Sequence, residues 1–368
     1  MSLYGPIVIL LATVSGIWIP CTLLCCVPWV QKQMLYLHWV TLFPGKWLEE
    51  PERAGFLKNQ IVPFRLPTKD GERLFAWLIA PLGIYSKNVE SFTRETTGVH
   101  GDVEAKLALK LLRDDPEARL LIYFHGNTAT VAQSRRTEEY RMYSSGASDK
   151  LFILAFDYRG FGKSTGTPSE QGLINDAEAV VEWALNVAGL SSDRIVLLGH
   201  SLGTAVSTAI AHHYMSLDVP VEFAGLILCA SFTNCGKAFS SYSIAGVLPL
   251  LAPVKLIPAL QRWFSSQMRD TWLTDQRLSA LVRQPSRFQL VMVHAENDAT
   301  MPWNQTEELF KTAIRAAAEG SSESEAINKQ LRVIDLGEAG RQEVWKFEGI
   351  NISKLIAKHG GMRSFFVE

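Results

Sequence analysis

A serine between two glycines marks the segment VLLGHSLGTA, residues 196–205, as a place where chemistry can occur. The apolar residues before Gly199 predict a strand, and TAVSTAIAHHYM after the glycines predicts a helix. G-x-S-x-G between a strand and a helix is typical of a nucleophile elbow, a sharp turn that exposes a serine hydroxyl. We expect Ser201 to be the nucleophile, with Gly199, His200 and Gly203 supporting the turn; the alternative is a structural turn serine.

A serine hydroxyl becomes a good nucleophile only when a base takes its proton. Behind an elbow of this kind the partners follow along the chain as an acid and then a histidine. The segment FQLVMVHAENDATMPW offers Asp298 in the loop after a predicted strand, with Glu296 as the alternative acid. His359 is the single histidine after these carboxylates. We expect Asp298 to orient His359 as the base, and His294 to pack in the core.

Attack on an ester creates an oxyanion, which two backbone N–H groups can stabilise. One donor should be Leu202, the residue after the nucleophile. The other should follow the predicted strand RLLIYF, where HGN places Gly126 and Asn127. We expect Asn127 to be the second donor, Gly126 to allow a close backbone approach, and His125 to hold the loop.

Short apolar runs that alternate with helical segments must position these residues. Such runs are typical of strands buried on both faces, and the alternation predicts an α/β fold with a mostly parallel sheet and helices on both faces. Ligands bind such sheets at the carboxyl ends of the strands, where all the motifs fall. The predicted parallel strands are 119–124, 151–158, 194–199, 225–230, 288–295 and 331–336, preceded by two strands within 59–83.

The composition excludes several classes of partner. The net charge is −1, which gives no electrostatic case for nucleic acid. The five cysteines form neither a disulfide framework nor a C-x-x-C pair, and the chain has no P-loop and no dinucleotide-binding glycine string. We therefore expect no cofactor, no metal and no nucleic-acid partner.

The N-terminal segment Leu3–Val30 contains no charged residue. Twenty apolar residues can cross a bilayer, so we expect a single-pass transmembrane anchor over 1–31 and a membrane-proximal linker over 32–58. The side of the membrane stays open, because Lys32 and Lys46 favour a cytosolic domain whereas two glycosylation sequons favour a lumenal one.

The hydrolytic domain is expected over 59–368, with a cap insertion at about 232–284. Within the insertion, SSYSIAGVLPLLAPVKLIPALQ carries one charge and three prolines. A soluble enzyme rarely exposes such a segment. It is either a buried connection or a cap that binds an acyl chain and touches the membrane.

Taken together, HGN, DYRGFGKS, GHSLG and HAENDATMPW resemble the α/β-hydrolases in order and spacing. NQIVPFRLPTKDGERLFAWLIAPLG and the N-terminal segment resemble the membrane-anchored α/β-hydrolase domain-containing 12 type, which has fungal relatives of this length. That branch includes monoacylglycerol and lysophosphatidylserine lipases. The resemblance implies the α/β-hydrolase fold and a serine hydrolase of the endoplasmic-reticulum membrane that acts on lipid esters.

The sequence departs from the family at its end, AKHGGMRSFFVE. The family's histidine stands in strings such as GGHN. If the glycines are aligned, Met362 occupies that place and His359 lies three residues earlier. Either His359 serves after a local shift, or the C-terminus is altered and the chain is inactive, since a thioether cannot accept a proton.

Three functional hypotheses follow. The first is a membrane-anchored serine hydrolase that cleaves monoacylglycerol or lysophospholipid through an acyl-enzyme. The second is a protein depalmitoylating thioesterase, which uses the same acyl chemistry. The third, from another class, is an inactive membrane-bound relative.

Overall fold

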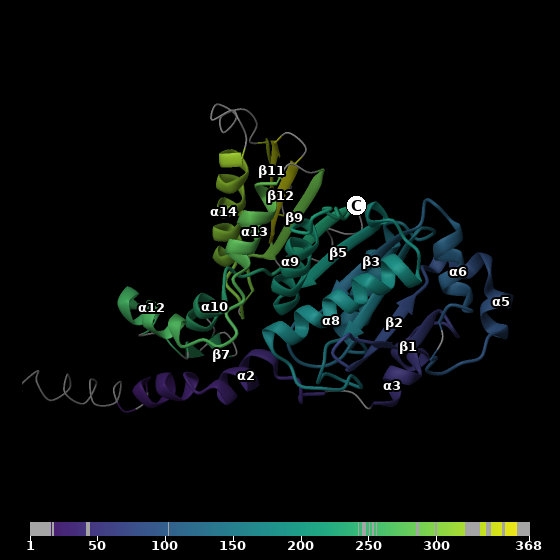
Figure 1. The fold of residues 1–368 in the computed structure, drawn as a ribbon, viewed down its shortest axis with the longest axis horizontal. Helices are drawn as coiled ribbons and strands as arrows, with labels where there is room; N and C mark the ends of the chain where they lie inside the picture. The colour runs from purple at the N-terminus through teal and green to yellow at the C-terminus, as the bar shows by residue number, and fades with distance from the viewer. Residues whose placement is uncertain are drawn as a thin grey trace, which may run out of the picture.

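A ten-stranded sheet runs through the computed structural model, which describes residues 16, 18–41, 45–101, 103–241, 243–244, 248–249, 251, 254, 256–284, 287–298, 300–320, 332–335, 340–347 and 350–358. The strand order is β1-β2-β4-β3-β5-β6-β9-β12-β11-β10 (Figure 1). The strands are β1 (Ile61–Pro67), β2 (Arg73–Ile79), β3 (Arg119–Phe124), β4 (Leu151–Asp157), β5 (Ile195–His200), β6 (Gly225–Cys229), β9 (Phe288–Ala295), β10 (Arg332–Asp335), β11 (Arg341–Phe347) and β12 (Ile350–Ala357).

The centre of this sheet is parallel, as the sequence predicts. Strands β4, β3, β5, β6, β9 and β12 pair in parallel, and the antiparallel pairs lie toward the two edges. Successive side chains of a strand point to opposite faces. In β2, Leu74 and Ala76 accordingly join one buried cluster, whereas Phe75 and Trp77 join the other. The sheet is therefore buried on both faces, which explains the apolar runs.

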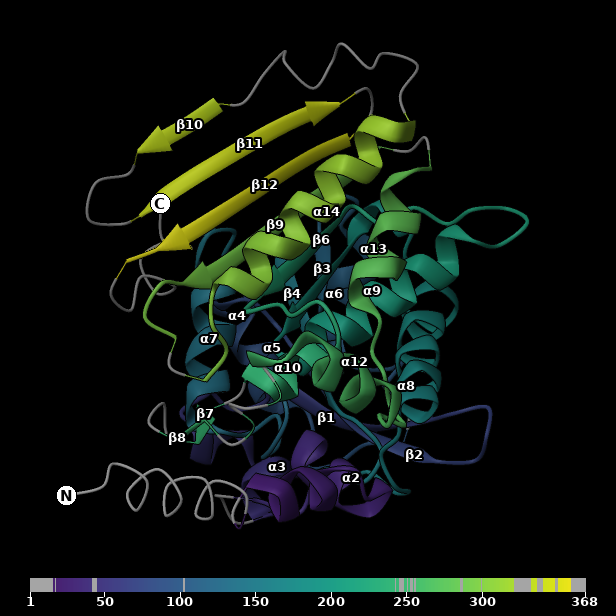
Figure 2. The ribbon, with the colours of Figure 1, turned by 90° about the vertical axis from the view of Figure 1, so that its left-hand side faces the viewer.

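Helices cover both faces of the sheet (Figure 2). Helices α8, α9, α13 and α14 share one face, and α7 packs on β4 from the other. The helices are α2 (Pro28–Tyr36), α3 (Lys46–Glu49), α4 (Leu82–Lys87), α5 (Val89–Arg94), α6 (Leu107–Asp114), α7 (Ser134–Ser145), α8 (Glu170–Glu182), α9 (Leu202–Met215), α10 (Cys235–Ser241), α12 (Pro258–Ser266), α13 (Thr274–Val282) and α14 (Asn304–Gly320), with single turns at Pro51–Ala54, Trp183–Val187 and Ser192–Arg194.

The last parallel strand is not the predicted one. Residues 332–335 form β10, which lies at the sheet edge and is antiparallel to β11. The parallel partner of β9 is β12, in register from Ile350↔Phe288 to Ala357↔Ala295. The prediction fails because Lys354 interrupts the apolar run of β12. Lys354 is nevertheless buried, because it forms ion pairs with Glu307 and Glu343.

Helix α2 packs on the domain through buried polar contacts. The Gln31 side chain donates to the carbonyl of Gln267 (2.9 Å) and accepts from the N–H of Arg269 (3.0 Å). The Tyr36 hydroxyl donates to Asp270 (2.8 Å). The boundary predicted at residue 31 thus falls inside a helix that contacts the domain. About half of the anchor predicted over 1–31, namely residues 1–15 and 17, lies outside the described residues. Within the described part of the chain no helix is both long and apolar enough to cross a membrane.

The predicted cap region lies between β6 and β9. It contains α10, α12, α13 and a two-stranded ribbon, β7 (Ser243–Ile244) and β8 (Leu248–Pro249). Helix α13 packs against α9 and α14 and so continues the helical layer, whereas α10 packs against α12. In Figure 1, α10 and α12 lie next to α2 at one end of the molecule. The insertion and helix α2 are therefore in contact.

Candidate active site

Ser201 lies at the turn between β5 and α9. It has φ 51° and ψ −116°, a backbone conformation that is strained for a residue other than glycine. Its N–H donates to the carbonyl of Cys229 on β6 (2.9 Å), and its own carbonyl accepts from the N–H of Thr204 (2.9 Å). These bonds hold the serine at the helix N-terminus, in the geometry of a nucleophile elbow.

The flanking glycines are required by close packing. A Cβ on Gly199 would lie 2.3 Å from the carbonyl oxygen of Gly203. A Cβ on Gly203 would lie 1.9 Å from the carbonyl oxygen of Phe124, at the end of β3. Both distances are far below van der Waals contact. The glycines therefore allow helix α9 to approach the two central strands behind Ser201.

The loop after β3 contacts this turn directly. A Cβ on Gly126 would lie 3.2 Å from Nδ1 of His200 and 3.3 Å from Cβ of Ser201. The His125 ring is fully buried and its Nδ1 lies 2.6 Å from the carbonyl oxygen of Gly126. Burial is the main reason that the pKa of His125 lies well below its usual value, so the ring is neutral. His125 accordingly holds the loop.

Of the two N–H groups predicted as oxyanion donors, that of Leu202 follows Ser201 directly in the chain, whereas Asn127 comes from the loop after β3. Leu202 is the first residue of α9, where an N–H has no intrahelical partner. Asn127 and Ser201 both line one cavity, as do Gly126 and Leu202. The structure thus brings the predicted donors and the serine together.

Asp298 follows β9 and lines the same cavity. Burial alone would raise the pKa of this carboxyl group. The buried His294 side chain and the N–H groups of Met301 (3.0 Å) and Thr300 (2.8 Å) outweigh burial, so the pKa lies below its usual value. His294 is fully buried, bonded to Thr306 and to the carbonyl of Met301, and does not line the cavity. Asp298 is therefore ionised at neutral pH.

The predicted base, His359, lies outside the described residues, as does Met362. The described chain ends at Lys358, directly after β12. The carbonyl of Ala357, the last residue of β12, accepts from the N–H of Glu296 (2.8 Å). The end of β12 thus lies next to the loop that carries Asp298, and the role of His359 stays a prediction.

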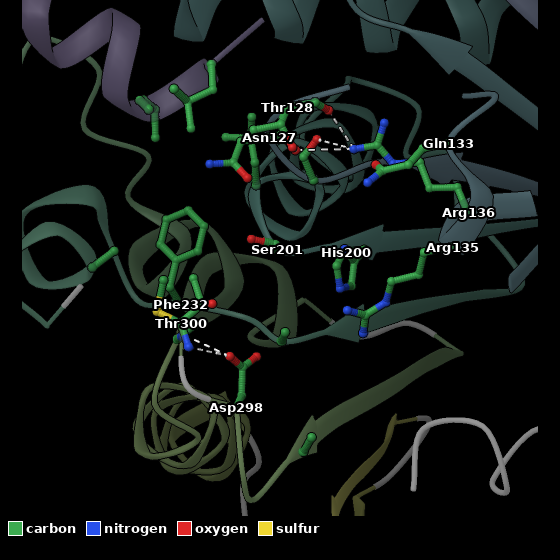
Figure 3. Close-up of a pocket in the computed structure, with 18 of the residues that line it drawn as sticks. Asn127, Thr128, Gln133, Arg135, Arg136, His200, Ser201, Phe232, Asp298 and Thr300 are labelled. Carbon is green, nitrogen blue, oxygen red and sulfur yellow. Dashed lines mark hydrogen bonds between the residues drawn. The ribbon is translucent and has the colours of Figure 1, made fainter. Parts of the chain in front are cut away.

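A cavity of about 580 Å³ is lined by Ser201, Asp298 and the two predicted oxyanion donors, Leu202 and Asn127. Figure 3 shows Ser201 at its centre, between apolar side chains on one side and polar side chains from α7 and its N-terminal loop on the other. The apolar wall comprises Met34, Leu35 and Leu37 from the α2 region and Phe232, Cys235, Ala238 and Phe239 from the insertion. The polar wall comprises Gln133, Arg135, Arg136 and Glu139.

The cap predicted over about 232–284 contains the insertion part of the apolar wall, whereas the α2 part and the polar wall are not predicted. The sequence assigns helix α2 to the predicted anchor and linker, although the polar run Gln31–Gln33 interrupts its apolar residues. The α7 residues carry no motif of their own. Their nearness to HGN is the one signal that could have revealed them, because a loop of a few residues cannot move far from its strand.

Comparison with known proteins supports this description. Residues 119–246 match the α/β hydrolase fold family. The chain is 32% identical to Protein ABHD12B of Homo sapiens over 200 residues, 54% of this chain and 50% of that protein. It is 26% identical to Lysophosphatidylserine lipase ABHD12 of Rattus norvegicus over 289 residues, 78% of this chain and 64% of that protein. The chain thus spans about half to two thirds of the length of these relatives.

A solved α/β hydrolase from Vibrio vulnificus superposes with a TM-score of 0.50 at 17% identity, over 74% of this chain and 75% of that one. This similarity shows the fold. Fold, elbow and matched segment define the class: this is an α/β-hydrolase-fold protein.

Within this class its relatives are ABHD12 and ABHD12B, which confirms the resemblance seen in the motifs and supports an α/β-hydrolase of the ABHD12 type.

Proposed function

We propose that this protein is a serine hydrolase that cleaves carboxylic esters of single-chain lipids, monoacylglycerol or lysophospholipid. The observation that carries the proposal is the position of Ser201, on a strained turn at a helix N-terminus inside a cavity that also contains Asp298. The apolar wall suits an acyl chain and the polar wall suits a head group, so a lipid ester would lie with its carbonyl at the serine.

The reaction proceeds in two steps. The Ser201 hydroxyl attacks the ester carbonyl while His359, oriented by Asp298, accepts its proton. The N–H groups of Leu202 and Asn127 stabilise the oxyanion. The tetrahedral intermediate expels the alcohol, which takes the proton from the imidazolium. Water, deprotonated by the imidazole, then releases the fatty acid and restores the serine.

A fluorophosphonate probe tests this proposal, because it labels only an activated serine. We expect the wild-type protein to be labelled and Ser201→Ala to remain unlabelled. Ser207→Ala is a matched control, since Ser207 lies buried on α9 and does not line the cavity. Absence of labelling in the wild type would overturn the proposal and leave an inactive relative.

The substrate class requires a second measurement. A lipase should release fatty acid from monoacylglycerol or lysophospholipid in detergent, whereas a depalmitoylating thioesterase should prefer an acylated protein. The volume of the cavity, about 580 Å³, and its apolar and polar walls support the lipid ester. Faster turnover of an S-palmitoylated peptide than of monoacylglycerol would favour the thioesterase.

We also propose that residues 1–31 anchor the protein as a single-pass protein of the endoplasmic-reticulum membrane. The support is the uncharged run Leu3–Val30, together with exposed apolar side chains near α2 and α12. Trp29 is 67% exposed, Trp39 65% and Leu256 79%. Tryptophan favours the membrane interface. Flotation with liposomes tests this: the full chain should float, and a chain lacking residues 1–27 should float less or not at all.

A further inference from the structure

The Arg136 side chain binds the loop that carries Gly126 and Asn127. Arg136 is 5% exposed, and its guanidinium donates to four backbone carbonyls. Nη2 reaches those of Gly126 (3.1 Å), Asn127 (3.2 Å) and Thr128 (2.8 Å), and Nη1 reaches that of Thr130 (2.8 Å). Figure 3 shows the guanidinium beside Asn127 and Thr128, on the far side of this loop from the apolar wall.

The position of Arg136 is unfavourable for the stability of α7. Arg136 is the third residue of the helix, where the positive end of the helix dipole disfavours a cation. Its charge is buried, yet the ion pairs found among the described residues do not include Arg136. A buried charge without a carboxylate partner is expensive. We therefore infer that the contacts with the loop explain why a buried arginine stands at this position.

The loop itself is strained. Thr128 has φ 64° and Ala129 has φ 52°, so two successive residues other than glycine adopt the left-handed conformation. That conformation is unfavourable for residues that carry a Cβ, because the Cβ comes too close to the following carbonyl oxygen. Carbonyls that converge on one guanidinium compensate for this cost, and they also determine the direction of each peptide unit.

The direction of one peptide unit matters for catalysis. A trans peptide places its N–H opposite its carbonyl. The Gly126 carbonyl faces Arg136 and also accepts from His125 Nδ1, so the N–H of Asn127 points away from the guanidinium. Gly126 packs on Ser201, so the peptide unit that carries this N–H lies next to the proposed nucleophile.

We propose that Arg136 is a positioning residue for the oxyanion hole: it holds the carbonyls of residues 126–130 so that the Asn127 N–H is directed at the ester oxygen in the transition state. The inference rests on the proposed serine hydrolase activity. It predicts an effect on kcat with little effect on KM, because the oxyanion contact is made in the transition state.

The test uses Arg136→Ala with and without free guanidinium, at concentrations well below its denaturing range. We expect kcat for p-nitrophenyl butyrate to fall about 10- to 100-fold at unchanged KM, and guanidinium to restore part of the loss. Arg136→Lys should recover little, since an ammonium cannot reach the four carbonyls as a planar fork. Hydrogen exchange should increase in residues 125–131.

Arg141→Ala is the matched control. Arg141 lies on the same helix and also donates to backbone carbonyls, those of Thr137 and Ala54, away from the cavity. We expect its kcat to stay near the wild-type value and guanidinium to have no effect. The melting temperatures of both variants report any general loss of stability.

The outcomes separate this inference from the proposed function. If Arg136→Ala folds and keeps wild-type kcat, or if Arg136→Lys alone restores kcat fully, the positioning role is wrong. If the variant melts early and guanidinium restores nothing, the role is structural and the inference is also wrong. If fluorophosphonate does not label the wild type, the hydrolase proposal fails; unchanged exchange at 125–131 in Arg136→Ala would then overturn the loop contact as well.

Discussion

The N–H of Glu296 donates to the carbonyl of Ala357 over 2.8 Å, and this bond joins the ends of β9 and β12. Asp298 lies two residues beyond the first partner and His359 two residues beyond the second. The end of β12 therefore lies beside the loop that carries Asp298. His359 itself lies outside the described residues, and its role as the base stays a prediction.

The first prediction concerns this histidine. We expect His359→Gln to lower kcat for an ester about a thousandfold or more, because no group then takes the serine proton. Met362→His is the contrasting variant and should add nothing if His359 already serves. The prediction is wrong if His359→Gln leaves the rate unchanged while Met362→His raises it. That result would show that Met362 stands where the family has its catalytic histidine.

The second prediction concerns the acid. The Asp298 pKa lies below its usual value, against the effect of burial, so the carboxylate persists as the pH falls and the histidine protonates first. Activity should therefore rise with pH as the base deprotonates. Asp298→Asn should lower kcat about a thousandfold or more with KM little changed. Glu296→Gln is the control; a loss of equal size there would move the role of the acid to Glu296.

The third prediction concerns packing behind the nucleophile. Gly203→Ala places a Cβ 1.9 Å from the carbonyl oxygen of Phe124, so we expect a loss of about 1–3 kcal/mol or more in the free energy of unfolding. Gly101→Ala is the control, because a Cβ there meets nothing within 4 Å. Denaturant unfolding measures both. Equal stability of the two variants would contradict the close approach of α9 to β3.

The fourth prediction concerns the buried Asp157. Burial raises its pKa from 3.8 to about 7, so the folded state binds a proton that the unfolded chain releases. This contribution to stability is complete below about pH 4 and is lost as the pH rises toward 7. Asp157→Asn keeps an oxygen for the N–H of Val131 and removes the titration.

We expect the stability gained by Asp157→Asn, relative to wild type, to be larger at pH 8 than at pH 4.5 in thermal melts. The exposed Asp218 offers a control, since Asp218→Asn should give the same small difference at both values. A gain that does not depend on pH would show that Asp157 is ionised throughout.

Local signals explain what the sequence reveals. The elbow can be predicted because the strand, the two glycines, the serine and the helix are neighbours in the chain, and each has a local steric reason. The HGN loop and the loop with Asp298 are predictable for the same reason, since each follows an apolar run. The central parallel strands are predictable because burial on both faces requires continuous apolar residues.

Long-range pairing explains what was missed. Residues 331–336 and 350–357 are both short and partly polar, and nothing local tells which one pairs with β9. Lys354 suggests a surface position until Glu307 and Glu343 are seen beside it. In the same way the sequence predicts α2 as part of an apolar N-terminal segment, and only the structure shows that Gln31 forms hydrogen bonds with residues 267 and 269.

The amino-acid sequence alone determined the turn that carries Ser201, the class of fold and the uncharged N-terminal run, because these depend on residues close together in the chain. The tertiary structure decided that β12 lies beside β9, that α2 forms a wall of the cavity, and that Arg136 faces the loop after β3. Each of these depends on contacts between segments whose meeting is determined by the packing of the whole chain.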